Sequence, residues 1–312
     1  MTALLGWIGG RARWLLVIGA FIGLAAPDVA AFLRPALPVF ISMVYALAML
    51  RVEPAEIWRG LSRPAEALRA ALAVFAMLVV APALGFLAVR LLGLGSDFEA
   101  AVVYTLAAPP IASAAAMCLL VGFSGALALR LTVLASLAMP VTGPLAAEAL
   151  VGASLDISPL TLGLRMAAMI GGGIIAALIL RRVMGRARIE RNAAALDGVA
   201  AIGFLLFILP LFDGVRGAIL AAPQQALAFL ALASAIIVGG VALALRAPGG
   251  RARNGAAGVV SSTRSVAIFL AALPPDPAFA LYVALYQFPM AAIPLVFQRT
   301  KSPIGARSPR KP

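Results

Sequence analysis

Long runs of apolar residues constrain the fold of this chain more than any other feature of its sequence. Hydrophobic residues make up 63% of its 312 residues and charged residues only 12%, whereas soluble domains have about half and about a quarter. A helix needs about 20 mostly apolar residues to cross the hydrocarbon core of a bilayer. Because backbone groups in lipid must bond within their own segment, these runs predict helices. The sequence therefore predicts an all-α integral membrane protein.

Ten apolar runs divide the sequence, and the connections between them are too short for a separate soluble domain. We interpret residues 1–312 as one membrane domain whose basic tail, 299–312, lies in the cytoplasm. The first run is interpreted as a retained helix and not as a cleaved signal. The ten predicted spans are 13–27, 34–50, 68–92, 98–120, 125–150, 160–181, 197–214, 218–245, 255–273 and 277–298.

Basic residues between the predicted spans are distributed very unevenly. If both termini are cytoplasmic, the opposite side carries only Arg34, Arg90 and Arg216, as the positive-inside rule requires. This asymmetry predicts a multi-pass protein of the cell membrane, in bacterial terms the inner membrane, with both termini in the cytoplasm. The cytoplasmic set is Arg11, Arg13, Arg51, Arg59, Arg63, Arg69, Arg181, Arg182, Arg186, Arg188, Arg191, Arg246, Arg251, Arg253, Arg299, Lys301, Arg307, Arg310 and Lys311.

Two of the ten spans contain residues that interrupt a helix. Pro109 and Pro110 remove two backbone donors from the middle of the fourth span, which frees carbonyl groups there. The ninth span contains two glycines and the polar run 261–265. Spans four and nine correspond if the chain is two five-span repeats of opposite orientation, about 13–150 and 156–298, an arrangement typical of transporters. A simple proline kink is the alternative interpretation.

Several classes of function require residues that this chain does not have. The chain has no histidine and one cysteine, Cys118, which removes the usual ligands of zinc and haem and the usual acid–base residue. No acid pair, nucleophile constellation or phosphate-binding loop appears, so we expect no enzyme. The net charge of +13 is explained by cytoplasmic loops, and we expect no nucleic-acid partner.

The stretches "APPIASAAAMCLLVGFSGALALRLTVLASLAMPVTGPL" (108–145) and "SSTRSVAIFLAAL" (261–273) resemble the bile acid:sodium symporter superfamily. The resemblance covers nearly the whole chain in layout. It implies ten helices in two inverted five-helix repeats, a core domain and a panel domain, and broken fourth and ninth helices that cross. It also implies sodium sites beside the crossing.

This sequence departs from the sodium-coupled members at the positions that would bind the ion. Hard cations prefer oxygen ligands and usually a carboxylate, and no predicted span has an acid near its centre. We therefore expect no sodium at the usual sites and no other cofactor. The aligned positions are Val259 in place of Glu, Thr263 and Arg264 in place of Gln-Asn, Ser113 and Ala114 in place of Ser-Asn, Ala128 in place of a hydroxyl, Met77 in place of Gln, and the retained Thr132.

Arg264 lies near the middle of the ninth predicted span, where an unpaired charge is costly and marks a functional candidate. Carbonyls freed around Pro109 and Pro110, together with Ser113 and the serines beside Arg264, are the expected acceptors for its guanidinium. One hypothesis is that Arg264, with Arg130, replaces bound sodium and pairs with a carboxylate or sulfonate substrate. The alternatives are a structural link between the broken helices and, for Arg130, an interfacial side chain that snorkels.

The prediction that follows is a secondary transporter of small organic anions that works by alternating access. The alternatives are a sodium-coupled or exchanger-type permease of related fold, arsenite- or auxin-carrier-like, and a membrane sensor that does not transport. The expected partners are a small organic anion and the lipid bilayer, and the sequence carries no signal for oligomeric state. The candidate residues for substrate binding or coupling are Arg264, Ser113, Thr263, Ser262, Ser265, Arg130, Thr132, Pro109, Pro110, Tyr286 and Gln287.

Overall fold

Helices make up the regular structure of the described residues, and six of them are long and apolar enough to cross a membrane. The computed structural model describes Leu4, Leu5, Trp7, Val52 and Ala55 and the ranges 12–50, 62–152 and 157–298. The expected basic tail, 299–312, lies outside the described residues. The chain is thus an all-α protein whose apolar helices fit a membrane-embedded class.

Helical segments occur at every one of the predicted runs in the first half of the sequence. A π-helical stretch interrupts the third run, and the fourth is divided into two helices. The bounds are α2 (Ala12–Ala25), α3 (Pro27–Leu33), η1 (Arg34–Ala36), α4 (Leu37–Met49), α6 (Pro64–Phe75), η2 (Ala76–Val80), α7 (Ala81–Leu91), α8 (Ser96–Ala107), α9 (Ala114–Val121) and α10 (Gly125–Val151).

The second half of the sequence repeats this pattern, with the ninth run again divided into two helices. Two short helices, α12 and α14, lie between the longer ones. The bounds are α11 (Pro159–Met184), α12 (Arg186–Arg191), α13 (Ala193–Ile208), η3 (Leu209–Phe212), α14 (Val215–Ala221), α15 (Pro223–Arg246), α16 (Arg251–Ser262), α17 (Ala267–Ala272) and α18 (Pro277–Gln298).

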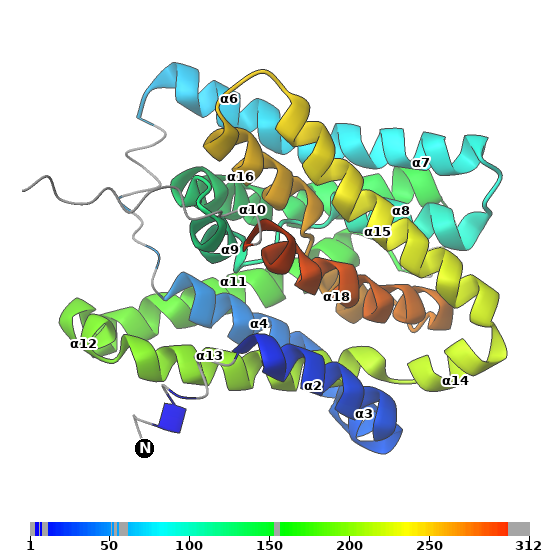
Figure 1. The fold of residues 1–312 in the computed structure, drawn as a ribbon, viewed down its shortest axis with the longest axis horizontal. Coiled ribbons are helices and arrows are strands. Elements are labelled where there is room, and N and C mark those ends of the chain that lie inside the picture. The colour runs from blue at the N-terminus through cyan, green and yellow to red at the C-terminus, as the bar shows by residue number, and fades with distance from the viewer. Residues whose placement is uncertain are drawn as a thin grey trace, which may run out of the picture.

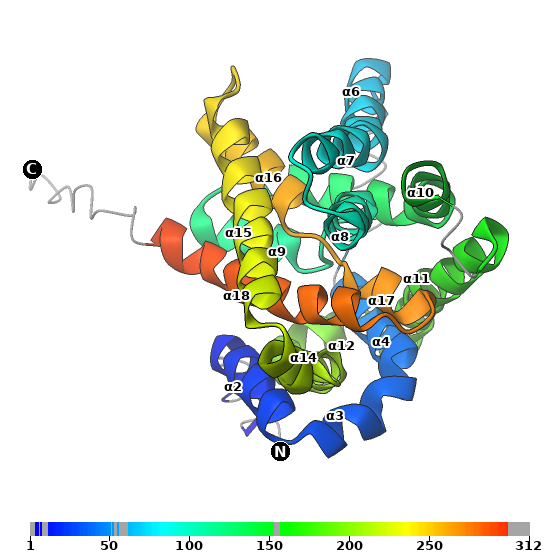
Figure 2. The same cartoon turned by 90° about the vertical axis from the view of Figure 1, so that its right-hand side faces the viewer.

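The described helices form two bundles. In the first, α4 packs on α11 and α13, and α2 packs on α13. In the second, α7 packs on α8, while α15 packs on both α16 and α18, and α10 contacts α8, α9 and α16. Figures 1 and 2 show α2, α3 and α4 on one side of the molecule and α6, α7, α15 and α16 on the other.

Close helix contacts in the first bundle depend on glycine. An ideal Cβ built on Gly173 of α11 would lie 2.5 Å from the Ser42 carbonyl oxygen and 2.5 Å from the Tyr45 Cβ of α4. The Ser42 hydroxyl also donates to the Met169 carbonyl at 2.9 Å. The backbones of α4 and α11 can approach this closely only because residue 173 has no side chain.

The helices of spanning length and composition are counted among the described residues only. Two of the predicted runs, the fourth and the ninth, are each divided into two shorter helices. Length and composition alone therefore identify six spans among the described residues.

Candidate functional site

The helix that begins at Ser96 ends at Ala107 because two prolines follow. Pro109 and Pro110 have no N–H to continue the helical hydrogen bonds. Proline also disfavours helical angles in the residue before it, and Ala108 is extended, with φ −70° and ψ 148°. The chain resumes as a helix at Ala114 after six non-helical residues, 108–113. The predicted interruption of this run is present.

The second interruption falls between α16 and α17 and contains no proline. Thr263 is extended, with φ −97° and ψ 99°, and its hydroxyl donates to the Val259 carbonyl at 2.7 Å. Hydroxyl side chains that bond the backbone in this way compete with helix hydrogen bonds. The predicted irregularity of the polar run 261–265 is therefore also present.

The two interruptions cross and pair with each other. Pro110 and Arg264 form an antiparallel bridge. The Ile111 N–H donates to the Thr263 carbonyl at 2.9 Å, and the Ser265 N–H donates to the Pro109 carbonyl at 2.8 Å. Each break thus satisfies backbone groups that the other break left without helical partners, as buried backbone requires.

Arg264 lies at this crossing with only 2% of its surface exposed. Its Nε donates to the Ser261 carbonyl at 2.7 Å, its Nη1 to the Ala108 carbonyl at 3.0 Å, and its Nη2 to the Met77 carbonyl at 3.4 Å. The acceptors belong to the end of α16, the end of α8 and the π-helical segment η2. One guanidinium therefore connects three elements of the second bundle.

The Met77 carbonyl is available because of local helix geometry. In an α-helix it would accept from the Ala81 N–H, but that group donates to Ala76 instead, in the π-helical pattern. The next residue in that pattern is Pro82, which has no N–H. The π segment and Pro82 together leave the Met77 carbonyl free for Arg264.

The electrostatics of the crossing favour a cation. Ala108 and Ser261 lie at the C-terminal ends of α8 and α16, where unsatisfied carbonyls carry partial negative charge. The guanidinium bonds of Arg264 go to carbonyl oxygens, and no carboxylate among the described side chains pairs with it. Arg264 is therefore held by neutral oxygens in the manner of a coordinated cation.

Tyr286 completes the crossing from α18. Its hydroxyl accepts from the Arg264 backbone N–H at 3.0 Å and donates to the Ser262 carbonyl. The side chain is fully buried. Tyr286 is one of the candidate residues for substrate binding or coupling, and the structure shows it hydrogen-bonded between helices.

Other predicted site residues lie near the crossing but do not bond to the guanidinium. Ser113 is the half-buried N-cap residue of α9 and makes no side-chain cap bond. The expectation that its hydroxyl accepts from Arg264 is not met, because the guanidinium bonds go to backbone carbonyls. Gln287, 9% exposed, donates to the Val283 carbonyl of its own helix at 3.1 Å.

Two buried hydroxyls in the same region have no hydrogen-bond partner within the described part of the chain. They are Thr132 of α10, 1% exposed, and Ser262, fully buried. Arg130 lies on the same helix as Thr132 and is half-buried. Buried polar atoms are normally paired, so these two hydroxyls are exceptions within the described residues.

Sequence reasoning missed several polar contacts that join distant helices. The Tyr282 and Thr105 hydroxyls are 2.8 Å apart, and the Tyr45 and Ser136 hydroxyls are 3.3 Å apart. Arg165 of α11 donates to the Ala272 carbonyl at the end of α17 at 2.8 Å. Of these residues only Arg165 has a signal in the sequence, as a charge inside an apolar run.

A search for groups of three or more His, Cys, Asp or Glu that could hold a metal finds none in the described ranges. No protein-family model matches the chain, and no curated protein matches it either. Fold and site define an all-α protein whose apolar helices fit a membrane-embedded class, with two crossed helix interruptions and a buried arginine between them.

Proposed function

We propose that this chain is a secondary transporter of small organic anions that works by alternating access, with Arg264 as a built-in cation. The observation that carries this proposal is the crossing of two interrupted helices around a guanidinium held by backbone carbonyls. Interrupted helices that meet in mid-membrane are how many transporters expose carbonyls and helix ends to ions and substrates.

Helix packing supports the ten-helix, inverted-repeat arrangement as part of this proposal. If α11 begins the second repeat, α11 corresponds to α2 and α13 corresponds to α4. The contact of α2 with α13 then corresponds to the contact of α11 with α4. Likewise, the packing of α7 on α8 corresponds to that of α15 on α16. The same pairs recur after five predicted spans, as expected for two related halves.

The division into two bundles supports alternating access. Contacts between the bundles include the packing of α10 on α11, the Tyr45–Ser136 pair, a side-chain contact of Tyr45 with Ser265, and the bond from Arg165 to Ala272. The backbone bridge of the crossing lies within the second bundle. A rigid-body motion of one bundle against the other would break these contacts and leave the crossing intact. Such rocking around a fixed site is the usual transporter motion.

The contacts of Arg264 favour a coupling role over direct pairing with the substrate. Its three nitrogens already donate to carbonyls, and its side chain is almost completely buried. A fixed guanidinium supplies the positive charge that a sodium-dependent transporter takes from the medium. The substrate anion would then bind without a co-transported cation, in a cell membrane with both termini cytoplasmic.

Uptake into proteoliposomes tests this function. A panel of radiolabelled carboxylates and sulfonates is offered with sodium or with choline as the external cation. We expect uptake of at least one anion, equal in both media, and loss of that uptake in Arg264→Gln. Arg216→Gln is the matched control, since Arg216 is exposed, and it should transport normally.

Two results would contradict the proposal. Uptake that requires sodium would favour the sodium-coupled permease, with the cation bound elsewhere than at Arg264. No uptake of any anion by protein that is folded and correctly inserted would favour the sensor.

A further inference from the structure

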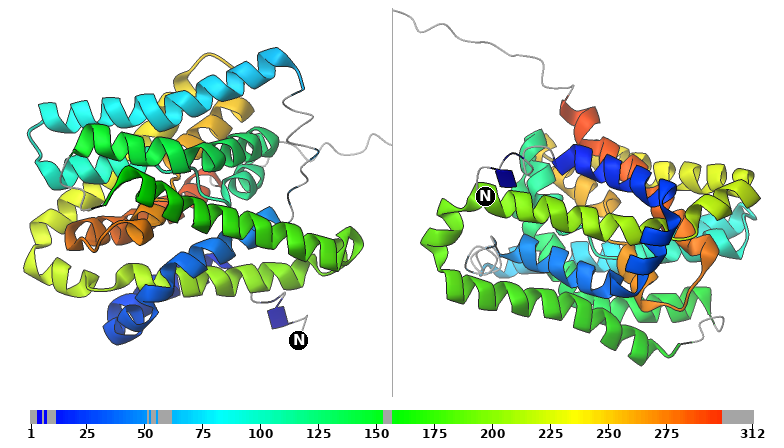
Figure 3. Two further views of the ribbon diagram at one scale, coloured as in Figure 1. Left: turned by 180° about the vertical axis from the view of Figure 1, so that it is seen from behind. Right: turned by 90° about the horizontal axis from the view of Figure 1, so that it is seen from below.

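The corner between α11 and α13 carries an unusual density of positive charge. Residues 181–191 contain five arginines and one glutamate. The corner joins two helices of membrane-spanning length, so it lies where a bilayer has its headgroups. Figure 3 shows α11 and α13 joined by α12 at one end of the molecule.

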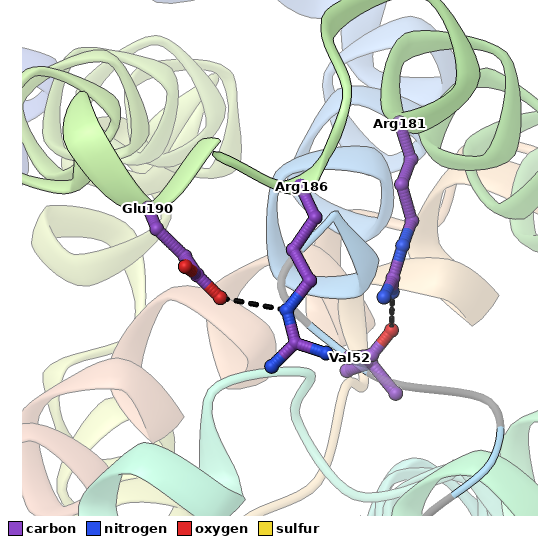
Figure 4. Close-up of polar contacts among 4 residues, drawn as sticks. All are labelled: Val52, Arg181, Arg186 and Glu190. Atoms are coloured by element: carbon purple, nitrogen blue, oxygen red, sulfur yellow. Dashed lines mark hydrogen bonds and ion pairs between the residues drawn. The ribbon is translucent and has the colours of Figure 1, made fainter. Parts of the chain in front are cut away.

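Two of the five arginines form a hydrogen bond or an ion pair with other groups of the protein. Arg181 donates to the Val52 carbonyl, and Arg186 pairs with Glu190 at 2.7 Å. In Figure 4 the guanidinium of Arg181 points to Val52, and that of Arg186 points to Glu190. The only acid of the corner is therefore committed to Arg186.

The other three arginines, Arg182, Arg188 and Arg191, are exposed. Their guanidinium groups have neither a hydrogen bond nor an ion pair to any residue that the structure describes. We call them the free corner arginines. Arg188 and Arg191 are three positions apart on α12, so their side chains leave the helix on the same side.

The side chains of Arg188 and Arg191 leave α12 on a different side from the ion-paired side chains of Arg186 and Glu190. At about 100° per residue, the Arg188–Arg191 side lies about 150° around α12 from the Arg186–Glu190 side. Ile189, which is 7% exposed, fixes the rotation of the helix by packing inward. Glu190 therefore leaves α12 on a different side from Arg188 and Arg191.

Apolar side chains suited to lipid lie directly beside Arg182. Val183 is 74% exposed and Ile179 is 58% exposed, as expected for residues that face acyl chains. A guanidinium at the end of such a surface is at headgroup depth, where arginine binds phosphate oxygens through two parallel hydrogen bonds. Clusters of arginine at this position attract anionic lipids.

We propose that the free corner arginines form a binding site for the headgroup of an anionic phospholipid. The acyl chains lie along the exposed face of α11 beside Val183, and the phosphate lies among the three guanidinium groups. This site is independent of the crossing at Arg264 and does not depend on the transport function.

Lipid titration of the purified full chain tests the site. The protein in neutral detergent is titrated with phosphatidylglycerol or phosphatidylcholine, and bound lipid is counted by native mass spectrometry. Each arginine near a membrane surface contributes a factor of about five in affinity. The triple variant Arg182→Gln, Arg188→Gln, Arg191→Gln should therefore bind phosphatidylglycerol about a hundred-fold more weakly.

A second triple variant controls for net charge. Arg246→Gln, Arg251→Gln, Arg253→Gln removes the same charge from three exposed arginines of the α15–α16 connection, and it should keep the wild-type affinity. Glu190→Gln removes the only negative charge of residues 181–191 and should tighten phosphatidylglycerol binding several-fold. Wild-type affinity in the corner variant, equal loss in both triple variants, or no gain in Glu190→Gln would each overturn the site.

Discussion

The backbones of Pro110 and Arg264 lie side by side in an antiparallel bridge, which locks two helix interruptions into one unit. Neither interruption satisfies all of its own backbone groups. The break at 108–113 has prolines that cannot donate, and the break at 263–266 supplies the Ser265 N–H to the Pro109 carbonyl. The crossing is therefore a shared structure that neither half can form alone, and Arg264 fixes it to a third element through Met77.

Tyr286 is expected to be essential for this shared structure. Tyr286→Phe removes the hydroxyl that accepts from the Arg264 N–H and donates to the Ser262 carbonyl. Each buried group left unpaired costs about 1–3 kcal/mol, so we expect a loss of about 3 kcal/mol in the free energy of unfolding. Thermal unfolding in detergent measures the change.

Tyr282→Phe is the matched control, because Tyr282 is on the same helix and is also fully buried. Its partner Thr105 can still bond to the Ala101 carbonyl at 2.7 Å, so the loss should be only about 1 kcal/mol. Equal destabilisation by the two variants would mean that the Tyr286 hydroxyl has no special role at the crossing.

The glycine run of α11 provides a paired test of packing in the first bundle. In Gly173→Ala the new Cβ would meet the Ser42 carbonyl oxygen at 2.5 Å, and overpacking of this kind costs about 1–3 kcal/mol. Gly171→Ala meets nothing within 4 Å and should be neutral, or stabilising by about 0.5–1 kcal/mol through helix propensity. A larger loss of melting temperature in Gly171→Ala would contradict the observed packing of α4 on α11.

Arg165 should restrain the two bundles relative to each other. Its bond to the Ala272 carbonyl joins α11 to the end of α17, and a guanidinium at a helix C-terminus is stabilised by the partial charge there. Arg165→Gln should speed deuterium uptake in residues 267–273 and lower stability by about 1 kcal/mol. Unchanged uptake in this segment would show that the bond does not hold the bundles together.

The sequence allowed the helical class and the positions of the interruptions to be predicted. Apolar runs depend on local composition, and Pro109 and Pro110 end a helix whatever surrounds them. Arg264 was recognised because a charge in an apolar run is rare. Carbonyl groups near Pro109 were expected to accept from it, and the bond to the Ala108 carbonyl confirms this.

The remaining contacts of the site could not be predicted, because they depend on tertiary structure. In a regular α-helix Pro82, which has no N–H, would leave the Leu78 carbonyl without a donor. Because this segment is π-helical, the carbonyl left without a donor is that of Met77. The pairing of Tyr45 with Ser136 joins helices whose relative positions no local pattern reports. The choice of acceptor also depends on tertiary structure: Ser113 is an expected acceptor for Arg264, but the guanidinium donates to backbone carbonyls.

The most direct test of Arg264 as a built-in cation is thermal unfolding of Arg264→Ala in defined salts. This variant leaves a carbonyl-lined space at the ends of α8 and α16. If the guanidinium replaces a bound ion, millimolar sodium or free guanidinium should raise the melting temperature of the variant above its value in choline of equal ionic strength. The wild-type protein should show no such difference. A variant that responds identically to all three cations would contradict the claim, and Arg264 would then be a structural link only.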